Sequence, residues 1–161
     1  MGTKKKYFYF FIITLTIFIL DRISKLYILN IAENFGVVDI EISSFLNLIL
    51  IWNTGIGFGL FSSEQVFFYN TLTLIIVSIN IIILFLAYKS ETYVSFFYIT
   101  VFAGSMGNLF DRLYYSAVPD FIDINFRGYH WFIFNVADIF ITLGIICLIV
   151  TEFLGYKRNK L

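Results

Sequence analysis

Residues 104–138, GSMGNLFDRLYYSAVPDFIDINFRGYHWFIFNVAD, are the most informative stretch of this chain. Apolar runs flank the stretch, yet it holds four aspartates, two arginines and the only histidine. Asp120 follows a polar break after one apolar run, and Asp138 lies within the next run. A carboxylate in an apolar helix is costly, so it usually faces the protein interior and has a partner there. We expect Asp120 and Asp138 to form such a pair.

The composition is that of a membrane protein. Of the 161 residues, 60% are hydrophobic, 21% are aromatic and only 14% are charged, whereas soluble domains are about half apolar and about a quarter charged. The length fits one membrane domain, residues 1–161. The formal net charge is zero and no basic block suits nucleic acid, so we expect no nucleic-acid partner. The single cysteine, Cys147, excludes an internal disulfide.

The first predicted span covers about residues 7–29. Its uncharged run, Tyr7–Leu20, is shorter than the roughly 20 residues that cross a bilayer, so the helix must continue past Asp21 and Lys25. The start resembles a secretory signal, but DRISK follows in place of a small-residue cleavage site, and we expect an uncleaved helix. Asp21 and Lys25 share a helix face. They form an ion pair or, alternatively, mark an interfacial helix end with snorkelling charges.

A β region is predicted at about residues 34–64. Loose alternation at Gly36–Ile42 and the run Phe45–Ile51 are typical of short strands. The glycines of Asn53–Gly59 indicate either close backbone approach to a bound group or an ordinary turn. We expect a small antiparallel sheet on the outer membrane surface.

Three further spans are predicted at about residues 66–88, 93–113 and 131–151, with an extracytoplasmic loop at about 114–130. The GSMG sequence of the third span resembles small-residue helix packing. The predicted fold class is an all-α polytopic membrane protein with four transmembrane helices and a small extracytoplasmic antiparallel β element. Seven of the 11 Lys and Arg residues fall on the side of the termini. The positive-inside rule therefore predicts cytoplasmic termini and places both aspartates near the external surface.

Two carboxyl groups close together in a low-dielectric site cannot both ionise easily, so one keeps its proton. The ionised member can then deprotonate a water while the protonated member hydrogen-bonds a substrate carbonyl. This reading needs no cofactor and no metal. Two non-enzymatic readings stay open at this point: a proton or solute carrier that uses the same buried charges, and a purely structural membrane subunit.

Other chemistries are weaker on the residues present. A serine mechanism would require Ser105 in GSMG, which is not a nucleophile elbow, to meet His130. A metal site is possible by ligand type from the acidic and histidine residues Asp120, Asp123, His130 and Asp138. Asp138 could instead pair with Arg112 or Lys25 to hold helices together. Asn108 and Asn135 each precede an aspartate by three residues and share a helix face with it, where they could bind substrate or each other.

The motifs GSMGNLFDRL, VPDFIDI and HWFIFNVAD, with DRISK at 21–25 and NTGIGFG at 53–59, resemble the lipoprotein signal peptidase (signal peptidase II) family. The resemblance covers nearly the whole chain. It implies a bacterial inner-membrane aspartyl protease that removes the signal peptide of prolipoproteins just before a cysteine that carries diacylglycerol. It also implies a diacylated prolipoprotein as substrate and contact with membrane lipids. We expect a monomer.

The resemblance assigns residues by motif position. Asp120 and Asp138 match the two catalytic aspartates of the family. Positions matching its substrate-binding and supporting residues are Asp21, Lys25, Asn53, Gly55, Asn108, Arg112, Asn135 and Ala137. Arg112 would tether lipid or peptide backbone, or serve in a structural ion pair.

This chain also departs from the family pattern. Pro119 replaces a residue with an N–H and so removes a donor. Ser116 replaces a usual glycine, Trp52 a frequent arginine, and Ile56-Gly57 a small pair. These departures concern the shape of the loop before Asp120 and the contacts with lipid.

Overall fold

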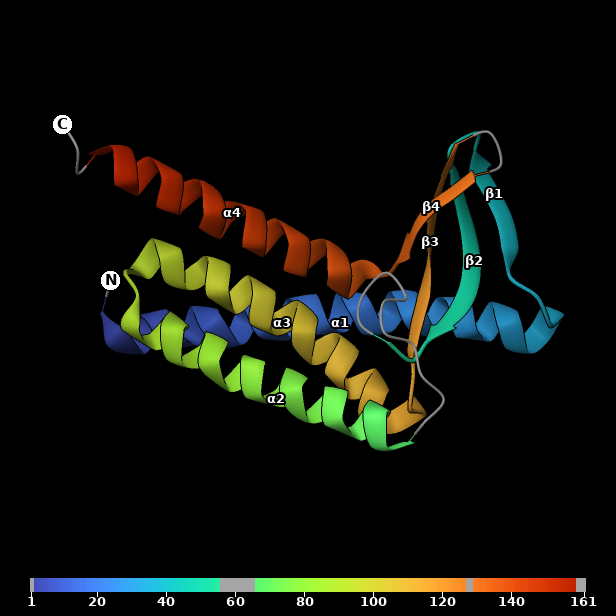
Figure 1. Ribbon diagram of the computed structural model, residues 1–161, viewed down its shortest axis with the longest axis horizontal. Helices are drawn as coiled ribbons and strands as arrows, with labels where there is room; N and C mark the ends of the chain where they lie inside the picture. The colour runs from blue at the N-terminus through green and yellow to red at the C-terminus, as the bar shows by residue number, and fades with distance from the viewer. Residues whose placement is uncertain (1, 56–65, 127–128, 159–161) are drawn as a thin grey trace.

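The computed structural model describes residues 2–55, 66–126 and 129–158. The described residues form four helices, α1 (Thr3–Phe35), α2 (Val66–Lys89), α3 (Thr92–Tyr115) and α4 (Val136–Arg158). They also form four strands, β1 (Asp39–Ser43), β2 (Leu46–Asn53), β3 (Val118–Phe126) and β4 (Tyr129–Phe134). The helices run alongside one another, and the sheet stands at one end of the bundle (Figure 1). The start of α1 and the end of α4 lie at the opposite end.

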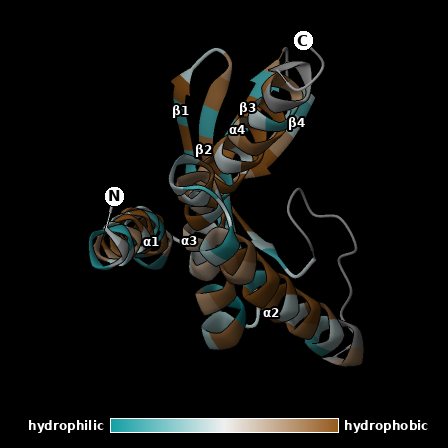
Figure 2. Ribbon diagram, turned by 90° about the vertical axis from the view of Figure 1, so that its left-hand side faces the viewer, coloured by the Kyte–Doolittle hydropathy of each residue, from teal (hydrophilic) through white to brown (hydrophobic). Residues whose placement is uncertain are grey.

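Three of the described helices are long and apolar enough to cross a membrane: Tyr69–Lys89, Thr92–Tyr115 and Val136–Leu154. Helix α2 is apolar almost throughout its length (Figure 2) and exposes large aliphatic side chains that suit contact with lipid. Helix α1 is the longest, with 33 residues, but Asp21, Arg22 and Lys25 interrupt its apolar run. Three of the predicted spans therefore coincide with helices that are long and apolar enough to cross a membrane. Helix α1 is long enough, but its charged residues leave it less apolar than the other three.

The sheet is larger than the sequence indicates. Its order is β1-β2-β3-β4 and every neighbouring pair is antiparallel. Strands β1 and β2 confirm the sheet predicted within residues 34–64. The predicted loop at 114–130, in contrast, contains β3, which pairs with β2 from Val118 to Ile124 and with β4 from Ile122 onward. From Phe121 to Phe126 buried side chains alternate with more exposed ones, as expected of a strand with two different faces.

The boundary predicted for the fourth span is wrong at its start. Trp131 lies in β4, and α4 begins only at Val136. The run Tyr129–Phe134 is rich in aromatic residues, which fit a strand as well as a membrane helix by hydrophobicity alone. Pairing with β3 decides the outcome, with Ile122 opposite Phe134. As a consequence Asp138 lies in the first turn of α4 rather than two turns inside a span.

The sheet is fixed to α1 by a small apolar core. Ile28 of α1, Val38 and Phe121 of β3 are all nearly inaccessible to solvent and lie in one cluster. Leu48 and Ile122, which pair across β2 and β3, pack against this cluster. Burial of these side chains is the main favourable contribution at the contact, and it fixes β3 relative to the helices.

Helices α3 and α4 pack closely because glycines lie between them. A Cβ on Gly104 would lie 2.5 Å from the carbonyl oxygen of Ala137, and one on Gly107 would lie 2.6 Å from Oδ2 of Asp21. Any larger residue would therefore push α4 or α1 away from α3. The prediction of small-residue packing at GSMG is confirmed.

The turn from α3 to β3 accommodates two of the unusual residues. Ser116 ends α3 with φ 58° and ψ 19°, the left-handed region, which favours glycine. Pro119 pairs with Trp52 of β2, and β4 joins β3 only from Ile122 onward. Pro119 therefore lies at the start of the strand, where proline is tolerated. The predicted departure Ile56-Gly57 lies outside the described residues.

Candidate active site

Asp120 lies near the start of β3 and is only 3% exposed. Two side-chain amides donate to its carboxylate: Nδ2 of Asn135 to Oδ1 at 2.6 Å and Nδ2 of Asn53 to Oδ2 at 2.9 Å. The amide of Asn53 is itself oriented, because its Oδ1 accepts the backbone N–H of Gly55 at 2.9 Å. This bond between residues two apart is an Asx turn, so the structure shows a turn at Gly55. Close approach of the glycines to a bound group stays a prediction, and Gly57 and Gly59 lie outside the described residues.

Asp138 is held by the start of α4. Asn135 immediately precedes the helix, and its Oδ1 accepts the backbone N–H of Asp138 at 3.1 Å. In return Oδ2 of Asp138 accepts the backbone N–H of Asn135 at 3.1 Å. This reciprocal arrangement is a capping box, with aspartate at the third helical position. Nδ2 of Asn108 completes the set by donating to Oδ1 of Asp138 at 2.8 Å.

Asn135 connects the two carboxylates directly. Its Oδ1 caps α4 at Asp138 while its Nδ2 donates to Asp120. Since the side chain is fully buried, it has little freedom to leave this position. The structure thus brings Asp120 and Asp138 to one site through a shared amide. Asp138 stays partly exposed and contributes to the walls of two cavities.

The environment of Asp120 favours its neutral form. Burial raises the pKa of Asp120 from its ordinary value of 3.8 to about 6, and the negative charge of Asp138 contributes in the same direction. The hydrogen bonds from Asn53 and Asn135 and the positive charge of Lys25 oppose this increase in pKa. The proximity of Asp138 therefore makes the charge of one carboxylate unfavourable to the other.

A second group of charges lies deeper in the bundle. We call it the charged cluster; its members are Asp21, Arg22, Lys25 and Asp111. Nζ of Lys25 is 2.9 Å from Oδ2 of Asp21 and 2.6 Å from Oδ2 of Asp111. An Nη2 nitrogen of Arg22 is 3.1 Å from Oδ2 of Asp21 and 2.6 Å from Oδ1 of Asp111. Two cations thus balance two carboxylates.

The ion pair predicted for Asp21 and Lys25 is confirmed, and the interfacial reading with snorkelling charges is wrong. Both side chains are completely buried, because α3 covers them and supplies Asp111. Asp21 also accepts the backbone N–H of Ala137 at 3.1 Å. The charged cluster therefore connects α1 and α3 and, through Ala137, fixes the start of α4.

Lys25 links the charged cluster to Asp138 through one amide. Its Nζ donates to Oδ1 of Asn108 at 2.8 Å, and Nδ2 of the same Asn108 donates to Asp138. With the amide oxygen turned toward the ammonium group, the amide nitrogen must face the carboxylate. Lys25 thereby determines which end of Asn108 is presented to Asp138.

Arg112 is 5% exposed and lies beside the same site. Its Nη2 donates to the carbonyl oxygen of Gly55, and its guanidinium group lies 5.8 Å from the ring centroid of Tyr69. Its Nη1 is buried and has no hydrogen-bond partner among the residues that the structure describes. Arg112 therefore fixes the backbone next to Asn53. Its Nη1 is available to donate a hydrogen bond to a bound group.

The residues that a serine mechanism, a metal site or an ion pair of Asp138 would need do not lie together in the described part of the chain. His130 lies in β4, where its Nδ1 is 2.7 Å from Oδ2 of Asp123, while Ser105 lines a cavity between helices. Within the described part of the chain, no three His, Cys, Asp or Glu side chains are arranged to hold a metal ion. Asp138 has no ion pair with Arg112 or Lys25 among the described contacts.

Sequence reasoning placed ten residues at the site, and missed the contributions of Arg22 and Tyr69. Arg22 immediately follows Asp21, so its presence in DRISK was the available signal. In the sequence, Asp111 is only the aspartate that follows Asn108 by three residues on the same helix face. Both Asn108 and Asp111 contact Lys25, which confirms that they share that face. Tyr69 gives no signal in the sequence, since it is one of 11 tyrosines.

Comparison with known proteins identifies the family of this chain. Residues 13–154 match the family described as signal peptidase (SPase) II. The chain is 51% identical over 157 residues to the lipoprotein signal peptidase of Pelagibacter ubique, covering 97% of this chain and 95% of that protein. It is 40% identical over 146 residues to the lipoprotein signal peptidase of Anaplasma phagocytophilum, covering 88% of each.

Solved structures show the same fold. One bacterial membrane enzyme superposes with a TM-score of 0.76 at 32% identity, over 94% of this chain and 91% of that chain. A second bacterial membrane enzyme superposes with a TM-score of 0.70 at 29% identity, over 89% and 91% respectively. The matched region includes both aspartates and the charged cluster. The chain therefore belongs to the signal peptidase II family of membrane peptidases.

Proposed function

We propose that this protein is an aspartic endopeptidase that removes the signal peptide of diacylglyceryl-modified prolipoproteins, cutting just before the lipidated cysteine. The observation that carries the proposal is the pairing of Asp120 and Asp138 through Asn135, with amides rather than cations as hydrogen-bond donors. Two carboxyl groups in such surroundings retain one proton between them up to a pH of about 6, the pKa of Asp120.

Hydrolysis then follows from the two protonation states. The ionised carboxylate removes a proton from a water molecule, whose oxygen attacks the carbonyl carbon of the scissile peptide bond. The protonated carboxyl group donates a hydrogen bond to the carbonyl oxygen as negative charge develops there. The tetrahedral intermediate collapses when the C–N bond breaks, and the leaving nitrogen receives a proton from the carboxyl pair. Asn53, Asn108 and Asn135 keep both carboxylates in position throughout these steps.

A large cavity between α2, α3 and α4 suits the lipid part of this substrate. Its volume is about 610 Å³, within the roughly 300–1,000 Å³ typical of ligand sites. Most of its walls are aliphatic, while Asn108, Arg112 and Asp138 supply polar groups. Acyl chains would occupy the aliphatic part, and the spare donor of Arg112 would bind an ester or peptide carbonyl. We call this the helix cavity.

We further propose that α1 is a fourth span and that both termini are cytoplasmic, with the sheet on the external surface. Seven of the 11 Lys and Arg residues would then face the cytoplasm. The start of α1 and the end of α4 lie together at the end of the bundle opposite the sheet, which suits this topology (Figure 1). Single cysteines placed at either terminus should resist an impermeant thiol reagent in intact cells, and a cysteine at Asp39 should react; the reverse pattern would contradict the topology.

The proposed activity is tested with purified protein and a synthetic diacylated prolipoprotein peptide, with products identified by mass spectrometry. We expect one cut, directly before the lipidated cysteine, and no cut by Asp120→Asn or Asp138→Asn. Asp123→Asn is the matched control, because Asp123 lies three residues along β3 and is equally buried. Cleavage that survives either active-site change, or that occurs at another bond, would contradict the proposal.

A further inference from the structure

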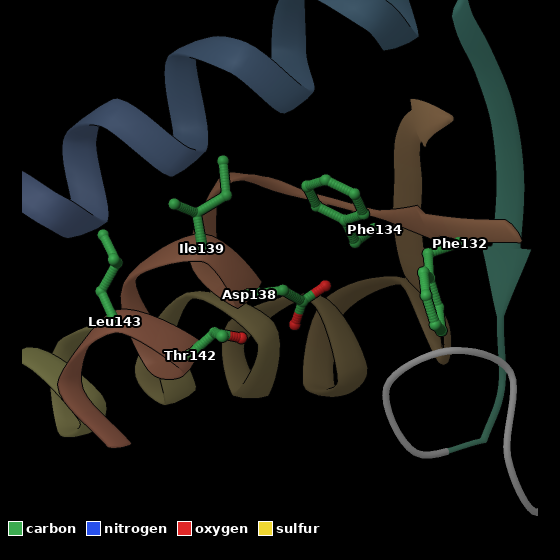
Figure 3. A pocket seen from close by; sticks show the side chains of 6 residues that line it. All are labelled: Phe132, Phe134, Asp138, Ile139, Thr142 and Leu143. Atoms are coloured by element: carbon green, nitrogen blue, oxygen red, sulfur yellow. The ribbon is translucent and has the colours of Figure 1, made fainter. Parts of the chain in front are cut away.

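A group of basic and aromatic side chains lies at the end of the bundle opposite the sheet, where α1 begins and α2 turns into α3 (Figure 1). The cavity between β4 and the first turns of α4 (Figure 3), by contrast, borders Asp138 and belongs to the proposed active site. The turn between α2 and α3 connects two helices that are long and apolar enough to cross a membrane. This turn therefore lies at a membrane surface.

Two contacts hold the start of α1 against this turn. Nζ of Lys6 donates to the carbonyl oxygen of Ser90 at 3.2 Å. The rings of Tyr7 and Tyr88 stack with their centroids 6.4 Å apart and an angle of 4° between their planes. The turn is itself fixed, because the buried hydroxyl of Ser95 donates to the same carbonyl oxygen of Ser90 at 3.0 Å. The start of α1 and the turn therefore form one continuous surface.

This surface is basic. Lys4 and Lys89 are exposed, Lys6 is partly buried, and Glu91 is the acidic residue of the turn. In the described part of the chain, none of these three lysines has an ion pair. The first turn of α1 contains no acidic residue, and the helix dipole is positive at that end, where cations are unfavourable. A negatively charged group bound at this surface would relieve the repulsion.

The two tyrosines indicate what kind of anion fits. Tyr7 is 41% exposed and Tyr88 is 62% exposed. Lys4 precedes Tyr7 by three residues and shares its helix face, while Lys89 directly follows Tyr88. Tyrosine is enriched at membrane interfaces, where its ring contacts apolar groups and its hydroxyl stays at the level of the headgroups. A phospholipid would contact both the lysines and the rings, whereas a soluble anion would contact the lysines alone.

We propose that Lys4, Lys6, Lys89 and the stacked rings of Tyr7 and Tyr88 form a binding site for an anionic phospholipid of the adjoining leaflet. Its phosphate lies among the ammonium groups, and its glycerol and upper acyl chains lie along the rings. We call these five residues the lipid site. Basic clusters beside membrane helices attract anionic headgroups in this way. The inference does not depend on the proposed function, because the lipid site takes no part in peptide cleavage.

The test measures lipid binding to the purified full-length protein in detergent by native mass spectrometry. It compares phosphatidylglycerol with phosphatidylcholine of the same acyl chains. We expect one phosphatidylglycerol to bind with an affinity about 10-fold or more above that of phosphatidylcholine. Lys4→Gln/Lys89→Gln should lower the affinity for phosphatidylglycerol about 10-fold and leave that for phosphatidylcholine unchanged. Glu91→Gln removes the acidic residue of the turn and should raise the affinity for phosphatidylglycerol.

Lys5→Gln/Lys157→Gln is the matched control, since it removes the same charge. Lys5 precedes Tyr7 by two residues and so lies on another face of α1, and the end of α4 lies apart from the start of α1 (Figures 1 and 2). The control should leave the preference for phosphatidylglycerol nearly unchanged. An equal loss in the control would overturn the inference, by showing that basic charge in general attracts the lipid.

Two further results would overturn the inference. One is equal affinity of the wild type for the two lipids. The other is displacement of phosphatidylglycerol by millimolar inorganic phosphate, which would assign the lysines to a soluble anion. Thermal unfolding in detergent verifies that each variant is folded. If Lys4→Gln/Lys89→Gln did not fold, Glu91→Gln would decide, because an unchanged affinity for phosphatidylglycerol in that variant would contradict the lipid site.

Discussion

The charged cluster and the pair of Asp120 and Asp138 are two groups of buried carboxylates in one protein, and they differ in their partners. In the charged cluster, Lys25 and Arg22 neutralise Asp21 and Asp111 at distances of 2.6–3.1 Å. At the pair, every side-chain donor among the described contacts is the amide of an asparagine. An amide holds a carboxylate in place without cancelling its charge. The first arrangement therefore suits stable packing, and the second suits proton transfer.

The two groups are also connected. Asn108 accepts from Lys25 and donates to Asp138, while Asp21 accepts from the backbone of Ala137 next to Asp138. The neutralised charges thus act as a rigid support for carboxylates that must remain reactive. A substitution in the charged cluster should accordingly act mainly on stability. A substitution in the pair of Asp120 and Asp138 should act mainly on turnover.

The largest effect is expected from Asp138→Asn. Loss of a general acid or base typically lowers a rate by about 10²–10⁴-fold, and the remaining carboxylate cannot perform both proton transfers. Turnover of a diacylated peptide measures the effect, while thermal unfolding in detergent verifies that the variant is folded. A variant with substantial turnover would show that Asp138 has only a structural role.

Lys25→Met should chiefly reduce stability. It leaves two buried carboxylates with one arginine, and breaking a buried pair in this way costs about 3–5 kcal/mol. The double variant Lys25→Met/Asp111→Leu should unfold at a higher temperature than Lys25→Met, because it removes the uncompensated charge. If the two changes were instead additive in their destabilisation, charge balance would not be the reason for the cluster.

Asp120→Asn should increase stability at alkaline pH. The folded protein raises the pKa of Asp120 from 3.8 to about 6, so the contribution of Asp120 to wild-type stability is fully present below pH 3.8 and is lost as pH rises through about 6. A difference of about two pKa units corresponds to about 3 kcal/mol. The variant should therefore unfold later than wild type at pH 8 but not below pH 4. Asp39→Asn, on an exposed strand, should show no such gain.

Arg112→Ala should have the smallest effect on the chemical step. Arg112 contacts the backbone of Gly55 and the ring of Tyr69, and among the described contacts it has no hydrogen bond with either carboxylate. We expect KM to rise about 10-fold with little change in kcat, the pattern of lost substrate binding. A loss of kcat as complete as that of Asp138→Asn, in a variant that still binds substrate, would place Arg112 in the catalytic set.

Much of this site could be predicted because charges are rare in an apolar chain. Asp120, Asp138, Asp21 and Lys25 stand out against uncharged runs, and helical spacing alone joins Asp21 to Lys25. The position of Asp138 within its helix could not be predicted. The aromatic run before it, Tyr129–Phe134, is apolar enough for either a membrane helix or a strand, so hydrophobicity does not decide where the helix begins. Only pairing with β3 makes it β4 and brings Asp138 to the first turn of α4. The closure of the charged cluster by Asp111 likewise depends on how α3 packs against α1.

The most direct test of the shared proton is a titration of the Asp120 carboxyl group by NMR of protein labelled with ¹³C at aspartate, with the signal assigned through Asp120→Asn. We predict a pKa of about 6 for Asp120 in the wild type. In Asp138→Asn the pKa should fall but stay above 3.8, because the negative neighbour is gone while burial remains. A pKa of Asp120 that is the same in both proteins would contradict the coupling of the two aspartates.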